Sequence, residues 1–324
     1  MLNVGYKITL GSDTFASGDA ASPVLAVRTE AAFAVPVNAC RIALHGLAQV
    51  SARAGDPVEV ALGYGDSLET VFTGVVGSVA HGLGRIEVEA VGALVALATL
   101  RVNLLYEQET AGGIVGDVLG KLNVAKGKVE TGIKLPAYAM DDGRSAWAHL
   151  RALATRCGFD FWADVKDKAQ FRPYDPPVTH TLTYGTDLLA WEHDARPAGW
   201  EGVEVLGESP AGQGQGDDAH DWLTKKEVKG TAGETSGRVL RIADPAARNA
   251  NLAADVAAGT LVEWAVTARG TARVLGAPAV QLGHAASFAK LPVSAHDGTA
   301  RVTAVRHRLD ARGGFVTTLG WERA

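Results

Sequence analysis

Histidine is the residue type in this chain best suited to acid–base or metal chemistry near neutral pH. Nine histidines occur, at the positions His45, His81, His149, His180, His193, His220, His284, His296 and His307. None forms an HExxH or HxH pattern, and none stands at metal-ligand spacing from a cysteine. The histidine pattern therefore predicts no metal site.

Two of these histidines stand beside acidic residues, the arrangement that a general base requires. The groups are His193 with Asp194, and His220 with Asp217, Asp218 and Asp221. The second group belongs to a Gly/Gln/Asp-rich loop, Ser209–Asp221, which would hold a preorganised site poorly. A cell-wall hydrolase or peptidase is therefore kept as an alternative function, supported by these two groups alone.

Other catalytic motifs are missing from the sequence. It contains no GxSxG nucleophile elbow, no Walker loop, and no GxGxxG motif leading from a strand into a helix. We therefore predict no catalytic residue, no cofactor and no enzyme activity. A carbohydrate-binding β module is a third possibility, disfavoured because aromatic residues make up only 6% of the chain.

The charge balance argues against a polyanionic partner. The net charge is −5, from 31 basic and 36 acidic residues, with no long run of either sign, so we expect neither nucleic-acid binding nor attraction to an anionic membrane. The strongest basic group is Arg301, Arg306, Arg308 and Arg312. Its plain interpretation is a solvated strand, and its functional one a rim that faces a partner subunit.

The two cysteines, Cys40 and Cys157, have no CxxC partner, which disfavours a zinc site or a redox dithiol and fits folding in a reducing cytoplasm. No secretory signal precedes the first strand, and the longest uncharged apolar run, Ala90–Leu100, is well short of the ~20 residues that span a bilayer. We expect a chain made in the cytoplasm, without a membrane span.

The first 90 residues alternate short apolar-patterned segments with turn residues, which predicts a barrel or sandwich. The predicted strands are Tyr6–Leu10, Pro23–Glu30, Asn38–Leu44, Val58–Tyr64, Phe72–His81 and Arg85–Val91. Gly11–Ala21 is predicted as a loop, and Gly82–Gly84 as the turn of a hairpin.

The middle third has helical spacing instead. Ala111–Leu122 is predicted as a helix capped by Thr110, and Arg144–Cys157 as a clearer one that starts after Asp141-Asp142 and stops at Gly158. A hairpin of two strands, Phe159–Val165 and Ala169–Tyr174, completes a small α+β unit.

Strand patterns return after Asp175-Pro176-Pro177. The predicted strands are Thr179–Tyr184, Leu188–Arg196, Arg269–Leu275, Ala279–Leu282, Arg301–Leu309 and Phe315–Leu319. A helix near 245–264 is expected to begin with Asp244 as its N-cap and Pro245 at its first position.

The run from Gly276 to Trp321 echoes the run from Gly55 to Ala90. Each begins Gly-x-Pro, and the closing strands carry Val79-Ala80-His81 and Val305-Arg306-His307. We therefore predict a mainly β protein in which two tube-like β-barrels, related by internal duplication, flank a helix–helix–hairpin unit. The expected domains are 1–104, 105–178 and 179–324. His81 and His307 should then share a structural role.

Three stretches together resemble the baseplate hub proteins of contractile tails, namely the phage late-control gene D family and the hub portion of the type VI VgrG spike. They are Asp56–Val60 with Phe72–Val76, Ser145–Ala154 with Cys157–Phe161, and Gly276–Pro278 with Gly283, Val302–His307 and Gly314–Leu319. Their joint order, rather than any one of them, carries the resemblance.

The resemblance implies a homotrimer whose six barrels join a sixfold tail tube to a threefold central spike. Its expected partners are a trimeric spike protein, the tail tube ring and neighbouring baseplate proteins. Ring closure is expected at the edges Val58–Tyr64 and Ala279–Leu282, and a neighbouring baseplate contact at Ser209–Asp221. The family places such a chain in the virion or injection-system particle. Since the sequence given ends at Ala324, after the last barrel strand, we expect the spike to be a separate chain.

Overall fold

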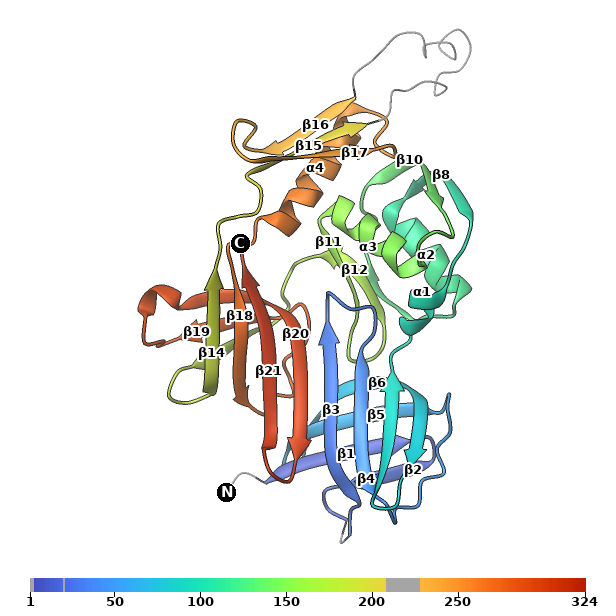
Figure 1. Cartoon of the computed structure of the whole chain (residues 1–324), viewed down its shortest axis with the longest axis vertical. Helices are drawn as coiled ribbons and strands as arrows, with labels where there is room; N and C mark the ends of the chain where they lie inside the picture. The colour runs from blue at the N-terminus through green and yellow to red at the C-terminus, as the bar shows by residue number, and fades with distance from the viewer. Residues whose placement is uncertain (1–2, 20, 208–227) are drawn as a thin grey trace.

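The computed structural model describes residues 3–19, 21–207 and 228–324. The predicted loop Ser209–Asp221, with His220, lies outside the described residues. Strands dominate, and most of them pair antiparallel. Figure 1 shows two β modules side by side at one end of the molecule and the helices, with smaller sheets, at the other end.

The first β module contains seven strands. They are β1 (Val4–Leu10), β2 (Asp13–Ala16), β3 (Val24–Ala32), β4 (Ala39–His45), β5 (Pro57–Tyr64), β6 (Ser67–His81) and β7 (Arg85–Val91). The six predicted strands are confirmed, and β6 and β7 form the predicted hairpin. The prediction of a loop over Gly11–Ala21 is wrong for Asp13–Ala16, since a tight turn at Gly11 brings that segment back onto β1.

The second β module contains six strands and a short 3₁₀ helix. They are β13 (Thr179–Thr183), β14 (Leu188–Ala195), β18 (Ala268–Leu275), β19 (Ala285–Ala289), β20 (Gly298–Asp310), β21 (Gly314–Arg323) and η2 (Ser294–His296). The predicted strand Ala279–Leu282 is wrong. That segment forms two turns, and Val280 and Leu282 are buried in the core as turn residues instead.

Strand β20 joins the two modules into one 13-stranded sheet. Its main path runs β14-β18-β21-β20-β3-β4-β7-β6-β5-β1-β2, with β19 also paired to β20 and β13 to β19. The pairing of β3 with β20 extends from Ala32↔Ala304 to Ala26↔Asp310. The two modules therefore share a continuous backbone ladder. Their origin by duplication into two barrels stays a prediction.

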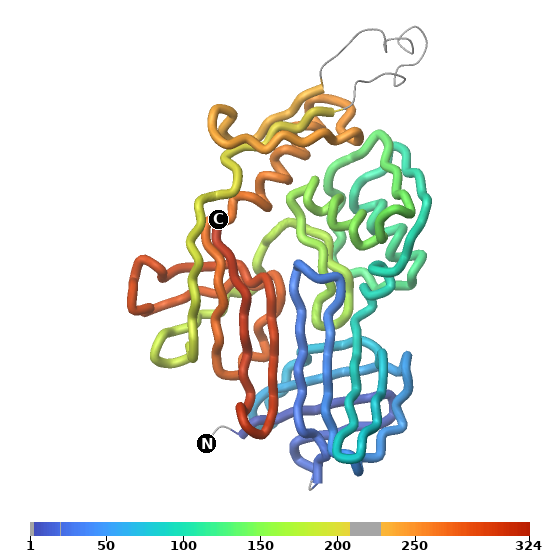
Figure 2. Tube along the Cα trace, viewed as in Figure 1, coloured from blue at the N-terminus to red at the C-terminus, as the bar shows by residue number. Residues whose placement is uncertain are grey.

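The helical part lies at one end of the two modules in space (Figure 2). In sequence, its first section separates the two modules, and its second section is inserted within the second module, between β14 and β18. Its first elements are α1 (Val95–Thr99), β8 (Leu104–Thr110), α2 (Ala111–Lys121), β9 (Lys126–Val129), β10 (Lys134–Met140), α3 (Ala146–Cys157), β11 (Phe159–Ala163) and β12 (Ala169–Pro173). Three strands and a helix follow β14: β15 (Gly202–Gly207), β16 (Lys229–Gly233), β17 (Val239–Asp244) and α4 (Ala250–Trp264).

The helix ends follow local chemistry. Thr110 accepts a hydrogen bond from the Gly113 amide at 3.0 Å, which confirms the predicted cap, and Gly158 ends α3 in the left-handed conformation at φ 66°. Ser145, rather than Asp141-Asp142, caps α3.

The predicted start of the last helix is wrong. Asn249 caps α4, accepting from the Leu252 amide at 2.9 Å, so the helix begins at Ala250. Asp244 ends β17 instead, and its carboxylate accepts from the guanidinium Nε of Arg156 at 2.6 Å. The packing of α3 against α4 brings Arg156, at the end of α3, next to Asp244.

Three hydrophobic cores lie in the described residues. One fills each β module, and Phe315 of β21 reaches into the core of the first. The third core contains α1, α2 and α3 together with Val203, Val205 and the buried face of α4. The predicted domain limits 1–104, 105–178 and 179–324 stay predictions, although this third core draws residues from both the second and the third of those ranges.

Candidate functional site

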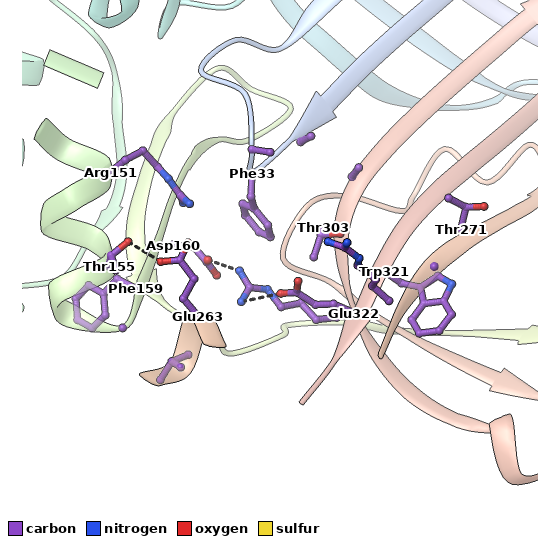
Figure 3. A pocket seen from close by; sticks show the side chains of 18 of the residues that line it. Phe33, Arg151, Thr155, Phe159, Asp160, Glu263, Thr271, Thr303, Trp321 and Glu322 are labelled. Carbon is purple, nitrogen blue, oxygen red and sulfur yellow. Dashed lines mark hydrogen bonds and ion pairs between the residues drawn. The ribbon is translucent and has the colours of Figure 1, made fainter. Parts of the chain in front are cut away.

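A cleft of about 560 Å³ lies where the helical part meets the β modules. Figure 3 shows its labelled side chains, which come from all three parts: Asp160 from β11, Glu263 from α4, Phe33 from the end of β3, and Thr303 and Glu322 from β20 and β21. The cleft brings together elements that are distant in sequence. We therefore take this cleft as the candidate functional site.

Arg301 of β20 lies at the centre of this junction. Its guanidinium pairs with the carboxylates of Asp160 and Glu322, the latter at 3.4 Å. It also lies over the ring of Phe33, with 4.6 Å to the centroid, and over Tyr174 at 5.1 Å. One side chain thus contacts β11, β21, β3 and the segment after β12.

Burial sets the electrostatics of this group. It raises the pKa of both Asp160 and Glu322, and the nearby Arg301 charge acts in the opposite direction on each carboxyl. Among the described residues that line the cleft there is no histidine, cysteine or serine. Thr155 donates to Glu263 at 3.1 Å, but threonine beside an exposed carboxylate is not an activated nucleophile. The geometry is that of a partly buried ion-pair network between the helical part and the β modules.

The predicted His193–Asp194 group does not form in the structure. Adjacent residues of a strand face opposite sides, so His193 stacks on Trp191, with ring centroids 5.5 Å apart, and on His296 at 4.4 Å. Asp194 accepts instead from Nε of Arg196 at 2.7 Å. His193 and Asp194 therefore do not form the acid–base pair that a hydrolase would need.

Other histidines serve packing. His149 is buried and its Nε2 lies 3.0 Å from the Asp141 carbonyl oxygen, and His180 Nε2 lies 2.9 Å from His284 Nδ1. His307 is buried in the middle of β20, 2.9 Å from Thr317 Oγ1, whereas His81 is exposed at the end of β6. The predicted shared role of His81 and His307 is therefore wrong.

Burial also sets the protonation of these groups. It lowers the pKa of His284 and of His307 to about 4. It raises the pKa of the Cys157 thiol to about 11 and that of Cys40 further, so both free thiols stay protonated and unreactive. No three His, Cys, Asp or Glu side chains of the described ranges gather as metal ligands would.

Two residues of the second β module have the spacing of a known catalytic motif. Ser287 and Lys290 match the SxxK pattern of serine acyl-enzymes. Ser287 lies in strand β19 and Lys290 follows at a left-handed turn with φ 59°. The Lys290 amide donates to Asp297 Oδ2 at 3.1 Å, and in the described residues no hydrogen bond joins the side chains of Lys290 and Ser287, so the spacing alone does not make a catalytic pair.

The predicted ring-closing edges are both wrong. Val58–Tyr64 corresponds to β5, which is paired with β1 on one side and β6 on the other, and Ala279–Leu282 is not a strand. The strands at the ends of the main path through the sheet are β14 and β2. Beside β14, an apolar groove of about 340 Å³ is lined by Tyr184, Leu189, Trp191, Leu291 and Val293, among others.

The predicted arginine cluster divides into two kinds of residue. Arg301 belongs to the junction, whereas Arg306 and Arg308 lie on the open face of the sheet, paired with Glu30 at 3.1 Å and Asp310 at 2.6 Å. On the same face of β4 and β7, Arg41 pairs with Glu89 at 2.6 Å. This face of mixed charge crosses from one module to the other through β3 and β20.

Comparisons with known proteins identify the fold. No protein-family model matches the chain, and no curated protein matches its sequence. A tail protein from Neisseria meningitidis is similar in structure, with TM-score 0.73 and 15% identity over 99% of this chain and 96% of that one. The 43 kDa tail protein of prophage MuSo2 from Shewanella oneidensis gives TM-score 0.70 and 11% identity, covering 98% of both chains.

A third similar structure is an E. coli component of the type VI secretion system, described as similar to the T4 bacteriophage tail proteins gp27 and gp5. It gives TM-score 0.61 and 13% identity over 97% of this chain and 76% of that one. The chain therefore has the fold of phage tail and type VI secretion proteins along its whole length. The narrower resemblance to the hub family stays a prediction. No helix of the described part is long and apolar enough to cross a membrane.

Proposed function

We propose that this protein is the structural baseplate hub of a contractile tail or injection system, a homotrimer that joins the sixfold tail tube to the threefold central spike. The observation that carries the proposal is the β3–β20 pairing, which fixes two β modules side by side in one sheet. Three such chains present six modules, so a threefold assembly can match a sixfold ring.

Each of the two modules contains a long hairpin in the shared sheet. β6–β7 and β20–β21 are both long hairpins, and their turns lie at the same end of the sheet. This similarity, together with the whole-length likeness to tail proteins, supports a duplicated module. The charged face that crosses β3 and β20 would then line the ring, its charges already paired within the chain.

Ring closure in this proposal uses the ends of the sheet. Apart from one isolated bridge between Leu188 and Tyr184, β14 pairs only with β18 in the described part of the chain, and its groove carries exposed apolar side chains such as Leu189. An edge strand beside an apolar groove is suited to pairing with another chain. The partner strand in the ring would be β2 of the next subunit, at the other end of the main path.

The remaining partners follow from the resemblance. A trimeric spike protein would bind at one end of the ring, the tail tube at the other, and neighbouring baseplate proteins around the outside. The proposal includes no catalytic residue, cofactor or nucleic-acid contact, and it places the chain in the cytoplasm during assembly and in the particle afterwards.

Mass photometry of the purified chain with its spike protein tests the proposal. We expect an assembly containing three copies of the 33.7 kDa chain. Leu189→Arg should prevent that assembly, because a cation in the groove would be buried without a partner, and should leave the unfolding midpoint unchanged. Leu105→Arg, at another exposed leucine, on β8, is the control. A wild-type chain that stays monomeric with the spike present would contradict the proposal.

A further inference from the structure

Two histidines of the second β module stack on one another beside the edge strand β14. His193 of β14 and His296 of η2 are both half-buried, and their ring centroids lie 4.4 Å apart with the planes 23° from parallel. The ring of Trp191 lies beside both, 5.5 Å from His193 and 5.4 Å from His296. Imidazole is the side chain that ordinarily gains its charge between pH 5 and pH 8, so this contact is sensitive to pH.

The backbone at His296 is fixed, so its ring is the part that can move. His296 lies in the segment 290–297, which connects β19 to β20. Arg323 of β21 donates to the His296 carbonyl at 2.9 Å, and the Asp297 carboxylate accepts from the amide of Leu291, a core residue, at 2.9 Å. Among the described residues no hydrogen bond involves the imidazole of His296, and stacking is what holds it.

The same ring closes one side of the apolar groove beside β14. The groove of about 340 Å³ is lined by residues of β14, of the segment 290–297 and by Tyr184, and His296 is among them. Because the His296 ring contacts both His193 and Trp191, it holds this segment against the strand. A His296 ring that left the stack would uncover Trp191 and widen the groove.

The carboxylates on the elements that meet at the stack are already engaged. Glu192 and Asp194 flank His193 on β14 and therefore face the opposite side of the strand. There Glu192 accepts from a threonine of β18 at 2.8 Å, and Asp194 accepts from an arginine of its own strand at 2.7 Å. Asp297 accepts from two backbone amides, and Glu322 of β21 pairs with the arginine of the junction.

The other neighbours of the stack add positive charge or none. The guanidinium of Arg323 lies 5.4 Å from the centre of the Trp321 ring, which itself stacks on His193 at 5.8 Å. Lys290 stands at the start of the same connecting segment, β19 contains no charged residue, and β18 places Gly270 opposite His193. Two protonated rings 4.4 Å apart would therefore repel one another without a counter-ion.

We propose that His193 and His296 form a pH-sensitive latch on the apolar groove. With at most one ring protonated, the stack persists and the groove keeps its present width. When mild acid protonates both rings, like-charge repulsion moves the His296 ring out of the stack, and the groove opens beside Trp191. The inference goes beyond the hub proposal and does not depend on it, because it concerns the chain by itself.

NMR titration of the full chain with ¹³C-labelled histidine tests the coupling of the two rings. In the wild type the second ring should bind its proton at least about tenfold more weakly than the first, because each charge opposes the other. In His296→Phe, which keeps an aromatic ring in the stack, His193 should titrate in a single step. The single variants His193→Phe and His296→Phe also assign the two signals.

Binding of the apolar dye anilinonaphthalene sulfonate tests the opening of the groove. Between pH 7.5 and pH 5.0 its fluorescence with the wild type should rise at least about threefold, as apolar surface becomes accessible. His296→Phe and His193→Phe should show little rise, because one ring of the stack stays uncharged. His45→Gln, which removes an exposed histidine at the end of β4, is the matched control and should behave as the wild type. Circular dichroism checks that each chain is folded at pH 5.0, and His307 is common to all of them.

The outcomes decide the proposal. Independent titration of the two rings overturns the latch, because the stack then imposes no penalty on the second charge. A rise in dye fluorescence that is equal in the wild type and in both phenylalanine variants also overturns it, since the opening then has another cause. Either result leaves the hub proposal standing, whereas a working latch in a chain that forms no trimer with its spike contradicts the hub alone.

Discussion

Arg301 and Asp160, which are 141 residues apart in the chain, form an ion pair that fixes the helical part against the β modules. Both side chains are largely buried, and the same guanidinium also pairs with Glu322 and covers the ring of Phe33. This arginine therefore joins three elements where the helical part meets the β modules, beside other contacts such as the Phe33–Trp162 ring pair and the hydrogen bond from Asn38 to the Ala163 carbonyl.

Arg301→Ala should lower the free energy of unfolding by about 3 kcal/mol, because it leaves the Asp160 carboxylate buried without its partner. Arg306→Ala, on the same strand, removes only an exposed pair with Glu30 and should cost less than about 1 kcal/mol. Urea denaturation of both variants measures the difference. Equal costs would show that the junction pair adds nothing beyond a surface contact.

Stability should fall in mild acid because of His307. Burial holds the pKa of His307 at about 4, below the roughly 6.5 of an unfolded histidine, so the unfolded chain binds the proton first. The contribution is fully present above about pH 6.5 and is lost as the pH falls through 6.5 toward 4. At pH 4.5 the loss should be about 2 kcal/mol.

His307→Gln provides the measurement for that loss. Its glutamine still reaches Thr317 but does not titrate, so its urea midpoint should fall less between pH 7.5 and pH 4.5 than that of the wild type. Asp167, whose pKa burial raises to about 6, acts in the opposite direction and cancels in this comparison because both chains contain it. Identical pH profiles would argue against a buried neutral His307.

Two glycine-to-alanine substitutions should change the free energy of unfolding in opposite directions. A side chain at Gly259 of α4 would collide with the carbonyl of Arg156, where α3 ends against α4, so Gly259→Ala should destabilise the chain by about 2 kcal/mol. Gly120 of α2 faces open space, and Gly120→Ala should stabilise it by up to about 1 kcal/mol. Thermal unfolding of the two variants checks both signs.

Local patterns in the sequence were enough to predict most strands and two of the helix ends. The alternation in β3, β4 and β7 and the cap at Thr110 depend on neighbours a few residues away, and the structure confirms them. Ala279–Leu282 has the same alternation, but a strand also needs a partner, and no strand of the described residues pairs with this segment. Its apolar side chains are buried from turns instead.

The junction could not be predicted in the same way. Arg301 alternates with its neighbours on β20 as a solvated strand residue would, and only the fold brings Asp160 to it. Likewise, the pattern Asp244-Pro245 is a sound helix start by its local chemistry. The competing partner, Arg156, lies 88 residues away, so no short window of sequence contains it.

The pairing of β3 with β20 also affects how the chain folds during its synthesis. Glu30 and Arg306 meet across it although 276 residues separate them. During synthesis β3 therefore leaves the ribosome with one edge open, and it keeps that edge until nearly the whole chain has followed. An unpaired edge invites other strands, and such distant pairing is slow. The two modules therefore complete their folding together, only after the C-terminal strands have been made. A truncated chain without β20 is expected to aggregate rather than to assemble into partly functional particles.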